Sequence, residues 1–527
     1  GVGVIAGAMI TWAAAQHGDL PSLVFKDQSF SHAEVEARSN RMAHALIGLG
    51  LQPGARIAVL LENSVESVDS VFGADKAALT YVALNARHTL AEHVAILADA
   101  QVSAVLLGSQ FAAIGNALAQ GEKRYLPDLK HILSIGFGGD GVQPLEPLLN
   151  KAVASAPAIE VGPEHIARIA YTSGTTGQPK GVVYTQERLL ARLNAHFLAM
   201  EYSLTHEDAM LHVGPLTHAA GVYLFPCFLR GARNIVQDRF DPAAMFESIA
   251  KHRVSHLMLV PTMMTRLVEA LENGAEANLS SLKRIHYGTA PTPVSLLRRA
   301  MQVFGPILRQ QYGMTEAVQP LTVLYPHQHV GSSETGADEA IGSCGRPTIN
   351  VNITVRGPDD QAVAQGDVGE IAIAHQGLGA VAFWRRPDLT ASSIRNGWFY
   401  TGDLGRFDVQ GYLHIVGRNK DMIITGGFNV YAKEVEDALL THPSVAEAAV
   451  VGLPDNQWGE IVAAFVVLRL GIHGDIAALQ SHCGERIAGY KKPRHLEFID
   501  AMPRNLAGKV VKASLRDAYL TRHAAHS

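Results

Sequence analysis

Cysteine is scarce in this chain. Only three cysteines occur among 527 residues, Cys227, Cys344 and Cys483, and they lie far apart in the sequence. A fold held together by several disulfides and a zinc site built from clustered cysteines are therefore excluded. So few cysteines are typical of a protein in a reducing cytoplasm.

Net charge and targeting signals are also lacking. Lysine and arginine total 44 against 49 acidic residues, a net charge of −5, so no overall charge attracts nucleic acid or an anionic membrane. The first basic residue is Lys26, so the apolar start (residues 1–18) lacks the basic region of a signal peptide. The stretch 209–229 is free of formal charge, but its histidines and prolines predict a buried wall rather than a bilayer span. We expect a cytoplasmic protein without stable membrane insertion.

Apolar residues make up 47% of the chain, enough for a sizeable core in two or three domains. A capping box at Ser31 and Glu34 starts a helical pattern, a buried strand follows at 57–61, and similar units recur. This alternation predicts an α/β fold, with a large layered N-terminal domain of mostly parallel sheets. After about Gly411, short strands (412–416, 446–451, 461–468 and 495–499) and two helices predict a small mobile α+β C-terminal domain. The expected bounds are 1–417, a hinge at 418–420, and 421–527.

The strongest motif is an eleven-residue string that follows a strand-like run at 166–170. Its glycines allow tight turns, its hydroxyls and amides donate, and its lysine adds charge, which together can surround a polyphosphate. A solvated turn would explain four or five such residues but not eleven, and the spacing is not that of a Walker loop. The string is Tyr171, Thr172, Ser173, Gly174, Thr175, Thr176, Gly177, Gln178, Pro179, Lys180 and Gly181.

The string resembles the phosphate-loop signature of the adenylate-forming superfamily, which includes acyl-CoA synthetases, aryl-CoA ligases, luciferases and peptide-synthetase adenylation domains. Five further motifs of that superfamily follow in order, and the resemblance covers about residues 20–515. They are Tyr287-Gly288-Thr289-Ala290-Pro291, Tyr312-Gly313-Met314-Thr315-Glu316, Tyr400-Thr401-Gly402-Asp403, the hinge motif 417–421, and Pro503-Arg504-Asn505-Leu506-Ala507-Gly508-Lys509.

The resemblance assigns catalytic roles to Lys509, Thr315 and Glu316. Lys509 would bridge the substrate carboxylate and the α-phosphate, Thr315 would contact that phosphate, and Glu316 would bring Mg²⁺ to ATP. It also implies a nucleotide site in which Asp403 accepts from the ribose hydroxyls and Arg418 assists. The remaining nucleotide-side residues would be Thr172, Ser173, Gly174, Thr175, Thr176, Gly177, Lys180, Gly288, Thr289, Ala290, Pro291, Gln311, Tyr312 and Gly313.

Coenzyme A would be the second cosubstrate after ATP. Gly426, Gly427 and Trp458 resemble segments that line the pantetheine tunnel when the small domain rotates, and Lys420 occupies the family's pivot position. Trp458 could equally be a half-buried aromatic residue of the core. The alternative interpretation of Lys420 is a solvated residue on a loop.

The acid pocket is expected near His218 and Tyr223. The neighbouring Leu224 and Phe225, with Ala317 and Val318, predict an apolar lining, and no arginine stands among these candidates to pair a second carboxylate. An aliphatic, aromatic or alicyclic acid is therefore favoured over a dicarboxylate. His327 and His329 form an HxH without a matching ligand cluster, so no transition-metal site is assigned to them.

Together these features predict an ATP-dependent ligase that joins an apolar carboxylic acid (fatty, aromatic or alicyclic) to CoA through an acyl-adenylate, releasing AMP and pyrophosphate. Loading of a carrier protein, a catalytically silent nucleotide-binding relative and a luciferase-like oxygenase are the alternatives. No nucleic-acid partner is expected, and a homodimer stays open.

Overall fold

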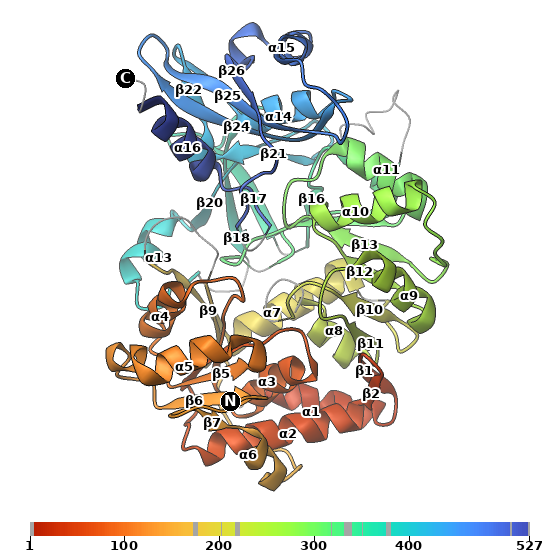
Figure 1. Cartoon of the computed structure of the whole chain (residues 1–527), viewed down its shortest axis with the longest axis vertical. Coiled ribbons are helices and arrows are strands. Elements are labelled where there is room, and N and C mark those ends of the chain that lie inside the picture. Colours follow the sequence, from red (N-terminus) through yellow and green to blue (C-terminus); the bar gives the residue numbers. More distant parts are fainter. Residues whose placement is uncertain are drawn as a thin grey trace.

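The computed structural model describes residues 5–171, 178–201, 203–216, 222–317, 319–330, 340–349, 351–375, 381–505 and 508–524. Its strands form four sheets, of seven, nine, five and five strands. The first three belong to the large N-terminal part, and the last lies above them with the C-terminus (Figure 1). The fold is therefore mixed α/β with a large N-terminal and a small C-terminal domain, as predicted.

The seven-stranded sheet is parallel except for its last pair, β8 and β9, which form an antiparallel hairpin. In spatial order its strands are β7 (Gln143–Pro144), β6 (His131–Ile135), β5 (Ala104–Gly108), β3 (Arg56–Leu60), β4 (Thr80–Ala83), β8 (Ile166–Tyr171) and β9 (Gly181–Thr185).

The nine-stranded sheet has a parallel centre and antiparallel strands at both edges. In spatial order its strands are β16 (Arg346–Pro347), β15 (Thr322–Leu324), β14 (Leu308–Tyr312), β13 (Arg284–Tyr287), β12 (His256–Met258), β10 (Ala209–His212), β11 (Arg233–Val236), β1 (Pro21–Phe25) and β2 (Gln28–Ser31).

Helices fill the space between these two sheets and cover their outer faces. One core cluster combines side chains of both sheets with those of α1, α2, α3 and α8, so these four helices lie between the sheets. The predicted capping box of Ser31 and Glu34 is present at the start of α2. The helices are α1 (Ala6–His17), α2 (His32–Gly48), α3 (Val65–Lys76), α4 (Leu90–Asp99), α5 (Ala112–Gln120), α6 (Glu146–Lys151), α7 (Gln186–His196), η3 (Phe197–Glu201), α8 (Leu224–Leu229), α9 (Pro242–His252), α10 (Pro261–Glu272) and α11 (Val294–Phe304).

Two apolar stretches of the sequence contribute to the folded layers of this body. Helix α1 is packed into the core through Ile10 and Ala13, and the uncharged stretch 209–229 contributes the central strand β10 and the short buried helix α8. Within the described ranges, no helix combines the length and apolarity needed to cross a bilayer.

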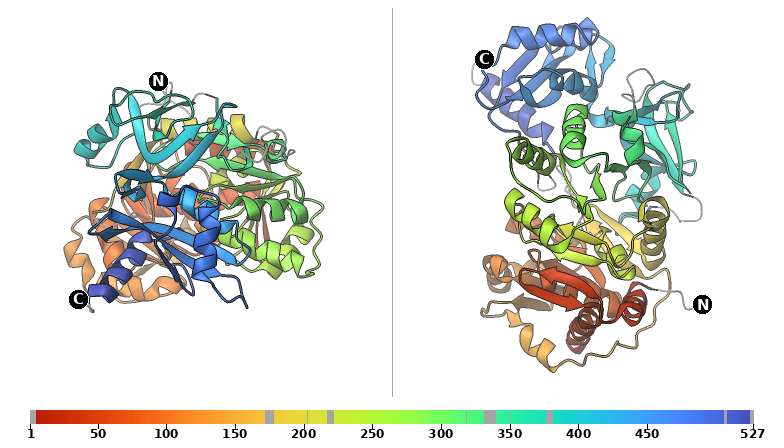
Figure 2. Two further views of the ribbon diagram at one scale, coloured as in Figure 1. Left: turned by 90° about the horizontal axis from the view of Figure 1, so that it is seen from above. Right: turned by 90° about the vertical axis from the view of Figure 1, so that its right-hand side faces the viewer.

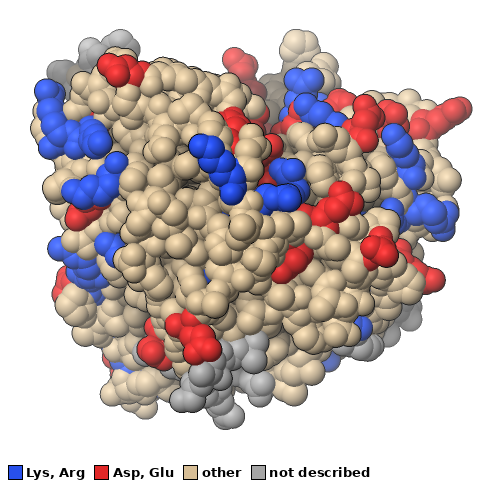
Figure 3. Space-filling model, turned by 90° about the horizontal axis from the view of Figure 1, so that it is seen from below, with Lys and Arg blue, Asp and Glu red and all other residues tan. Residues whose placement is uncertain are grey.

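Basic and acidic side chains surround a broad uncharged area on the face seen from below (Figure 3).

The third sheet is wholly antiparallel, which the sequence analysis did not foresee. Its strands are β17 (Val351–Arg356), β18 (Gly369–His375), β20 (Trp398–Phe407), β19 (Ile394–Arg395) and β21 (Leu413–Arg418), with α13 (Pro387–Ser393) beside them. The strand expected at 412–416 in the C-terminal unit is β21, and it pairs with β20 instead. That expectation was wrong because an apolar strand pattern does not reveal which neighbour completes its hydrogen bonds.

The C-terminal sheet begins after β21 and has its own core around Val435, Leu439 and Val450. Its strands are β23 (Phe428–Val430), β22 (Ile423–Thr425), β25 (Gly459–Leu468), β24 (Val445–Asp455) and β26 (His495–Phe498). They match the strands expected at 446–451, 461–468 and 495–499. Helices α14 (Ala432–Leu440), α15 (Ile476–Gly484) and α16 (Lys512–Ala524) pack around this sheet, which stands apart at one end of the molecule (Figure 2).

Candidate active site

Asp403 is fixed by three elements at the junction of the two domains. The antiparallel register of β20 and β21 sets it opposite Arg418, whose Nη1 lies 2.9 Å from Asp403 Oδ1. From the end of β14, the Tyr312 hydroxyl donates to Oδ2 at 2.5 Å. Burial and the Asp403 charge raise the pKa of Tyr312, so its hydroxyl stays protonated and donates. The result is an oriented, 7% exposed carboxylate, suited to accepting from a diol.

The turn after β14 is held through its backbone. The Tyr184 hydroxyl donates to the carbonyl oxygens of Thr315 (2.7 Å) and Ala317 (3.1 Å), and Arg188 Nη2 donates to that of Glu316 (3.2 Å). Tyr184 and Arg188 stand in β9 and α7, directly after the phosphate-loop string. Sequence analysis missed both, since neither belongs to a motif.

Glu316 is the free carboxylate of this turn. Burial raises its pKa, an effect opposed by the charges of Arg418 and Lys509. Among the described residues no side chain donates a hydrogen bond or an ion pair to it. A desolvated carboxylate to which no described side chain donates fits a hard cation such as Mg²⁺.

Lys509 reaches this region from the opposite end of the chain. It lies in a turn that two hydrogen bonds close: Asn505 N donates to Lys509 O (2.8 Å), and Lys509 N donates to Asn505 Oδ1 (3.0 Å). An isolated β-bridge between Arg504 and Val510 flanks the turn. Burial by the surrounding protein and the charge of Arg418 lower the pKa of the Lys509 ammonium, and the charges of Asp403 and Glu316 oppose this shift. Part of the side chain remains exposed. The structure therefore brings Lys509, Glu316, Asp403 and Arg418 within electrostatic reach of one another.

The loop after β13 approaches β14 very closely. Gly288 has φ +124°, and a Cβ built there would lie 2.0 Å from the carbonyl oxygen of Gln311. Only glycine fits this position. Thr289, Ala290 and Pro291 follow, and the Thr289 Oγ1 is buried without a hydrogen-bond partner.

Two sets of expected residues lie outside the described part of the chain. These are Thr172 to Gly177 of the phosphate-loop string, and His218 and Val318 of the acid pocket. The flanks of the string are defined, since Tyr171 of β8 pairs with Gly181 of β9, and Lys180 is exposed beside them.

The residues expected to meet CoA form a separate group in the C-terminal domain. Gly426 and Gly427 make the turn between β22 and β23 with φ of 55° and 82°, and Gly426 N donates to Trp458 O at 2.9 Å. The Arg494 guanidinium covers the Trp458 ring at 4.1 Å. Lys420 lies exposed in the short helical turn Asn419–Asp421 that follows β21.

The expected apolar lining of the acid pocket is not one surface. Leu224 belongs to the core between the two sheets, and Phe225 packs on Phe72 there, with ring centroids 5.7 Å apart. Tyr223 instead lies in a second cluster with Val323 and Met258. The expectation that Leu224 and Phe225 line a surface with Tyr223 is therefore wrong, because successive residues at a helix start point to different neighbours.

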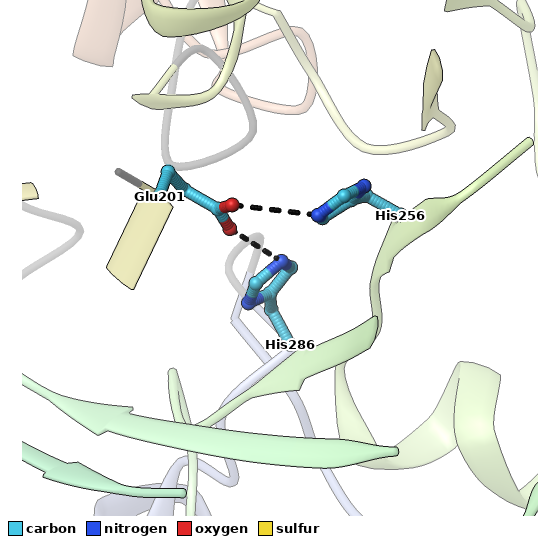
Figure 4. Close-up of side chains that lie close together, drawn as sticks. All are labelled: Glu201, His256 and His286. Atoms are coloured by element: carbon cyan, nitrogen blue, oxygen red, sulfur yellow. Dashed lines mark ion pairs between the residues drawn. The ribbon is translucent and has the colours of Figure 1, made fainter. Parts of the chain in front are cut away.

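A charged cluster lies next to Tyr223, and the sequence analysis missed it. Glu201, at the end of η3, accepts from His256 (Nε2 to Oε2, 3.4 Å) and His286 (Nε2 to Oε1, 3.2 Å), as Figure 4 shows. Arg309 of β14 forms an ion pair with the same carboxylate. All four residues are buried. Burial opposes ionisation of Glu201, but the hydrogen bonds from both histidines and the Arg309 charge lower its pKa.

The same cluster has the composition of a metal site. The ligand atoms of Glu201, His256 and His286 lie within 4.8 Å of one another. However, Arg309 occupies the Glu201 carboxylate and hydrogen-bonds His286, so a cation would have to displace a guanidinium. The cluster is better described as a closed buried ion-pair network. One indication of this cluster was present in the sequence, the isolated charge of Arg309 in the otherwise uncharged strand β14.

Known proteins resemble this chain over almost its whole length. The family described as AMP-binding enzyme matches residues 10–380, and the AMP-binding enzyme C-terminal domain matches 434–509. The medium/long-chain-fatty-acid–CoA ligase FadD8 of Mycobacterium tuberculosis is 32% identical over 97% of this chain and 89% of its own. A feruloyl-CoA synthase of Amycolatopsis sp is 34% identical over 93% and 94%. The amide bond synthetase McbA of Marinactinospora thermotolerans superposes with a TM-score of 0.86 at 28% identity, covering 98% and 100%. The chain belongs to the AMP-binding enzymes of the adenylate-forming superfamily and is an AMP-forming acid–thiol ligase.

Proposed function

We propose that this enzyme activates a small carboxylic acid with ATP and transfers the acyl group to coenzyme A. One observation carries the proposal. Lys509, from the C-terminal domain, lies within electrostatic reach of Glu316, Asp403 and Arg418 of the N-terminal part. A cation, a free carboxylate and an oriented diol acceptor at one place suit a reaction at the α-phosphate of a nucleotide.

In the first step an oxygen of the acid attacks the α-phosphorus, and the bond from that phosphorus to the β-phosphate oxygen breaks. Pyrophosphate leaves and an acyl-adenylate forms. Lys509 stabilises the negative charge that gathers between the acid and the phosphate. Asp403, held by Tyr312 and Arg418, orients the ribose, and the loop Gly288–Pro291 receives the adenine.

Glu316 would hold Mg²⁺, since burial raises the pKa of its carboxyl and no side chain of the described residues donates to it. When bound, the ion neutralises charge on the phosphates. Thr315, positioned by Tyr184, presents its hydroxyl to the same group.

In the second step the thiol sulfur of CoA attacks the acyl carbon, and AMP leaves with the electrons of the acyl–oxygen bond. The Gly426–Gly427 turn and Trp458 would meet the thiol arm after the small domain rotates about Lys420, so that 421–527 moves against 1–417. In the present arrangement Lys509 lies within electrostatic reach of Glu316 and Asp403, which suits the first step.

An amine is the second candidate acceptor, because the amide bond synthetase McbA has a closely similar fold. An acyl-adenylate can be opened by nitrogen as well as by sulfur. Carrier-protein loading is the third candidate.

The test separates activation from transfer. Purified enzyme with ATP, Mg²⁺ and a panel of acids is assayed for pyrophosphate release, and then for product mass after addition of CoA, of a primary amine or of a carrier protein. We expect acid-dependent pyrophosphate release and a CoA thioester. Release without any thioester would reject CoA as acceptor, and no release with any acid would reject the adenylation.

A further inference from the structure

The turn that carries Lys509 is held by hydrogen bonds on both sides of the lysine. Gly508 O accepts from Arg504 Nη1 at 2.7 Å, and Lys509 N donates to Asn505 Oδ1 at 3.0 Å. These two groups are the ends of one planar peptide unit, so the unit before Lys509 is fixed at both ends. Lys509 O accepts from Asn505 N at 2.8 Å, which fixes the unit after the lysine. Together the three bonds set the direction in which the Lys509 side chain leaves the backbone.

The base of this turn is anchored in the C-terminal domain. Val511 N donates to Pro503 O at 2.8 Å, and Arg504 forms an isolated β-bridge with Val510. Met502 and Val510 pack in one core cluster of the domain. The base is therefore fixed by packing, whereas the end that carries the lysine depends on the hydrogen bonds of Arg504 and Asn505.

Arg504 joins this end of the turn to the sheet of the domain. Its Nη1 donates to Gly508 O, and its Nη2 forms an ion pair with Glu447 of β24. Glu447 stands opposite Val467 of β25, so the carboxylate projects from a paired strand. A guanidinium is planar and rigid, so an ion pair at one of its nitrogen atoms also orients the nitrogen atom that donates to Gly508 O.

Stability alone is a weak reason for this ion pair. The side chains of Arg504 and Glu447 are 28% and 37% exposed, and ion pairs at such exposure contribute little to the free energy of unfolding. An ammonium that must meet an α-phosphate has a stricter requirement, because a displacement of about 1 Å can cost about 10²-fold in rate. The ion pair meets this requirement, since it restricts the backbone of Lys509 before any substrate binds.

We propose that Arg504 and Glu447 are positioning residues for adenylation, which act on the reaction only through the turn that carries Lys509. This rests on the proposed function, in which Lys509 serves the first step. All three residues belong to the C-terminal domain, so the ion pair travels with Lys509 when that domain rotates. Thioester formation does not use Lys509 in the proposed function and therefore does not need the ion pair.

The first experiment removes the guanidinium. Arg504→Met keeps an alkyl stem of similar length but loses both donors. We expect kcat of adenylation, measured by pyrophosphate exchange, to fall by about 10- to 100-fold, because Lys509 is displaced. The KM for ATP should not change, since the proposed nucleotide contacts are intact, and thioester formation from supplied acyl-adenylate should match wild type.

Arg522→Met is the matched control for this experiment. Arg522 of α16 forms an ion pair with Glu497 of β26 in the same domain, 2.7 Å between Nη1 and Oε1, and its loss should leave both half-reactions at wild-type rates. Wild-type adenylation by Arg504→Met would overturn the proposal. Equal loss of both half-reactions in Arg504→Met would overturn it as well, because a merely structural role would produce that result.

The second experiment tests whether Glu447 acts through Arg504. Glu447→Gln keeps an oxygen that can accept from the guanidinium and should retain most of the adenylation rate, whereas Glu447→Ala should lose part of it. The double variant Arg504→Met with Glu447→Ala should be no slower than Arg504→Met alone, since two residues that act as one unit are not additive. Additive losses would overturn the role of Glu447.

Hydrogen exchange keeps this proposal distinguishable from the proposed function, because it needs no turnover. The amides of Asn505 and Lys509 should exchange about tenfold faster in Arg504→Met than in wild type or Arg522→Met, while the amides of β24 keep their protection. Unchanged exchange would overturn the role of Arg504 in holding the turn, whether or not wild type adenylates an acid. If wild type released no pyrophosphate with any acid, the proposed function would fail, and faster exchange in Arg504→Met would still support the anchoring of the turn.

Discussion

At the residue scale, Lys509 provides the sharpest test of the assigned chemistry. Lys509→Ala should slow adenylate formation by about 10²–10³, because its charge serves the phosphorus-centred step. Thioester formation from supplied acyl-adenylate should be largely retained. Pyrophosphate exchange measures the first step, and a quench assay with synthetic acyl-adenylate measures the second.

Lys251→Ala, an exposed lysine on α9, is the control and should match wild type in both assays. Equal loss of both half-reactions in folded Lys509→Ala would contradict the role given to this lysine.

Arg418 should set the alkaline limit of the first step. The protein around Lys509 and the Arg418 charge lower the pKa of the ammonium, so its protonated form is lost at lower pH than in an ordinary lysine. Arg418→Gln removes a like charge and frees Asp403 from its ion pair, and both changes raise that pKa. The alkaline limb of the adenylation pH–rate profile should therefore move to higher pH, even if the maximal rate falls.

Arg299→Gln, which breaks an ion pair with Glu272 elsewhere, should leave that limb in place. A limb that stays fixed or moves to lower pH in Arg418→Gln would show that Lys509 is not the group titrating.

At the element scale, the contact between the loop after β13 and strand β14 depends on Gly288. Gly288→Ala should lower the free energy of unfolding by more than the roughly 1 kcal/mol that a left-handed alanine costs, because the new methyl group would also collide with the Gln311 carbonyl. Denaturant unfolding measures the difference. ATP affinity, measured by titration calorimetry, should fall as well, since β14 carries Tyr312.

Gly305→Ala is the matched control, with φ +88° and open space around its added methyl group. It should show the cost of the left-handed backbone alone. If Gly288→Ala lost no more free energy of unfolding than Gly305→Ala, the loop after β13 and strand β14 could move apart without a loss of stability.

At the scale of the whole molecule, the proposed two-step reaction calls for rotation of the small domain, with Lys420 as the predicted pivot. Lys420 follows β21 directly, the last strand of the third sheet, and precedes the C-terminal sheet that begins with β22. Lys420→Pro fixes φ near roughly −65° and should hinder rotation between the two steps. Since Lys509 already lies within electrostatic reach of Glu316, thioester formation should fall more than adenylation, and acyl-adenylate should accumulate on the enzyme.

Single-turnover quench assays of each half-reaction measure this, with Lys420→Ala as the control that keeps the backbone free. Wild-type rates for both steps in Lys420→Pro would place the pivot elsewhere.

The layered α/β body, the separate C-terminal unit and the order of the motifs could all be predicted from the amino-acid sequence. These features are local: a capping box at Ser31 and Glu34, apolar strand runs, and strings of glycine and hydroxyl residues whose spacing is written in the chain. For the same reason the motifs single out Lys509 and Asp403, whose roles stay predictions.

Which distant segments share a surface could be seen only in the folded chain. β21 joined the third sheet because its hydrogen bonds are completed by β20, and Leu224 turned away from Tyr223 into the core between the sheets. Glu201 and Arg309 meet across 108 residues, and burial makes their pairing obligatory. No local pattern encodes such a contact, because it arises only when the sheet and the helices covering it are packed together.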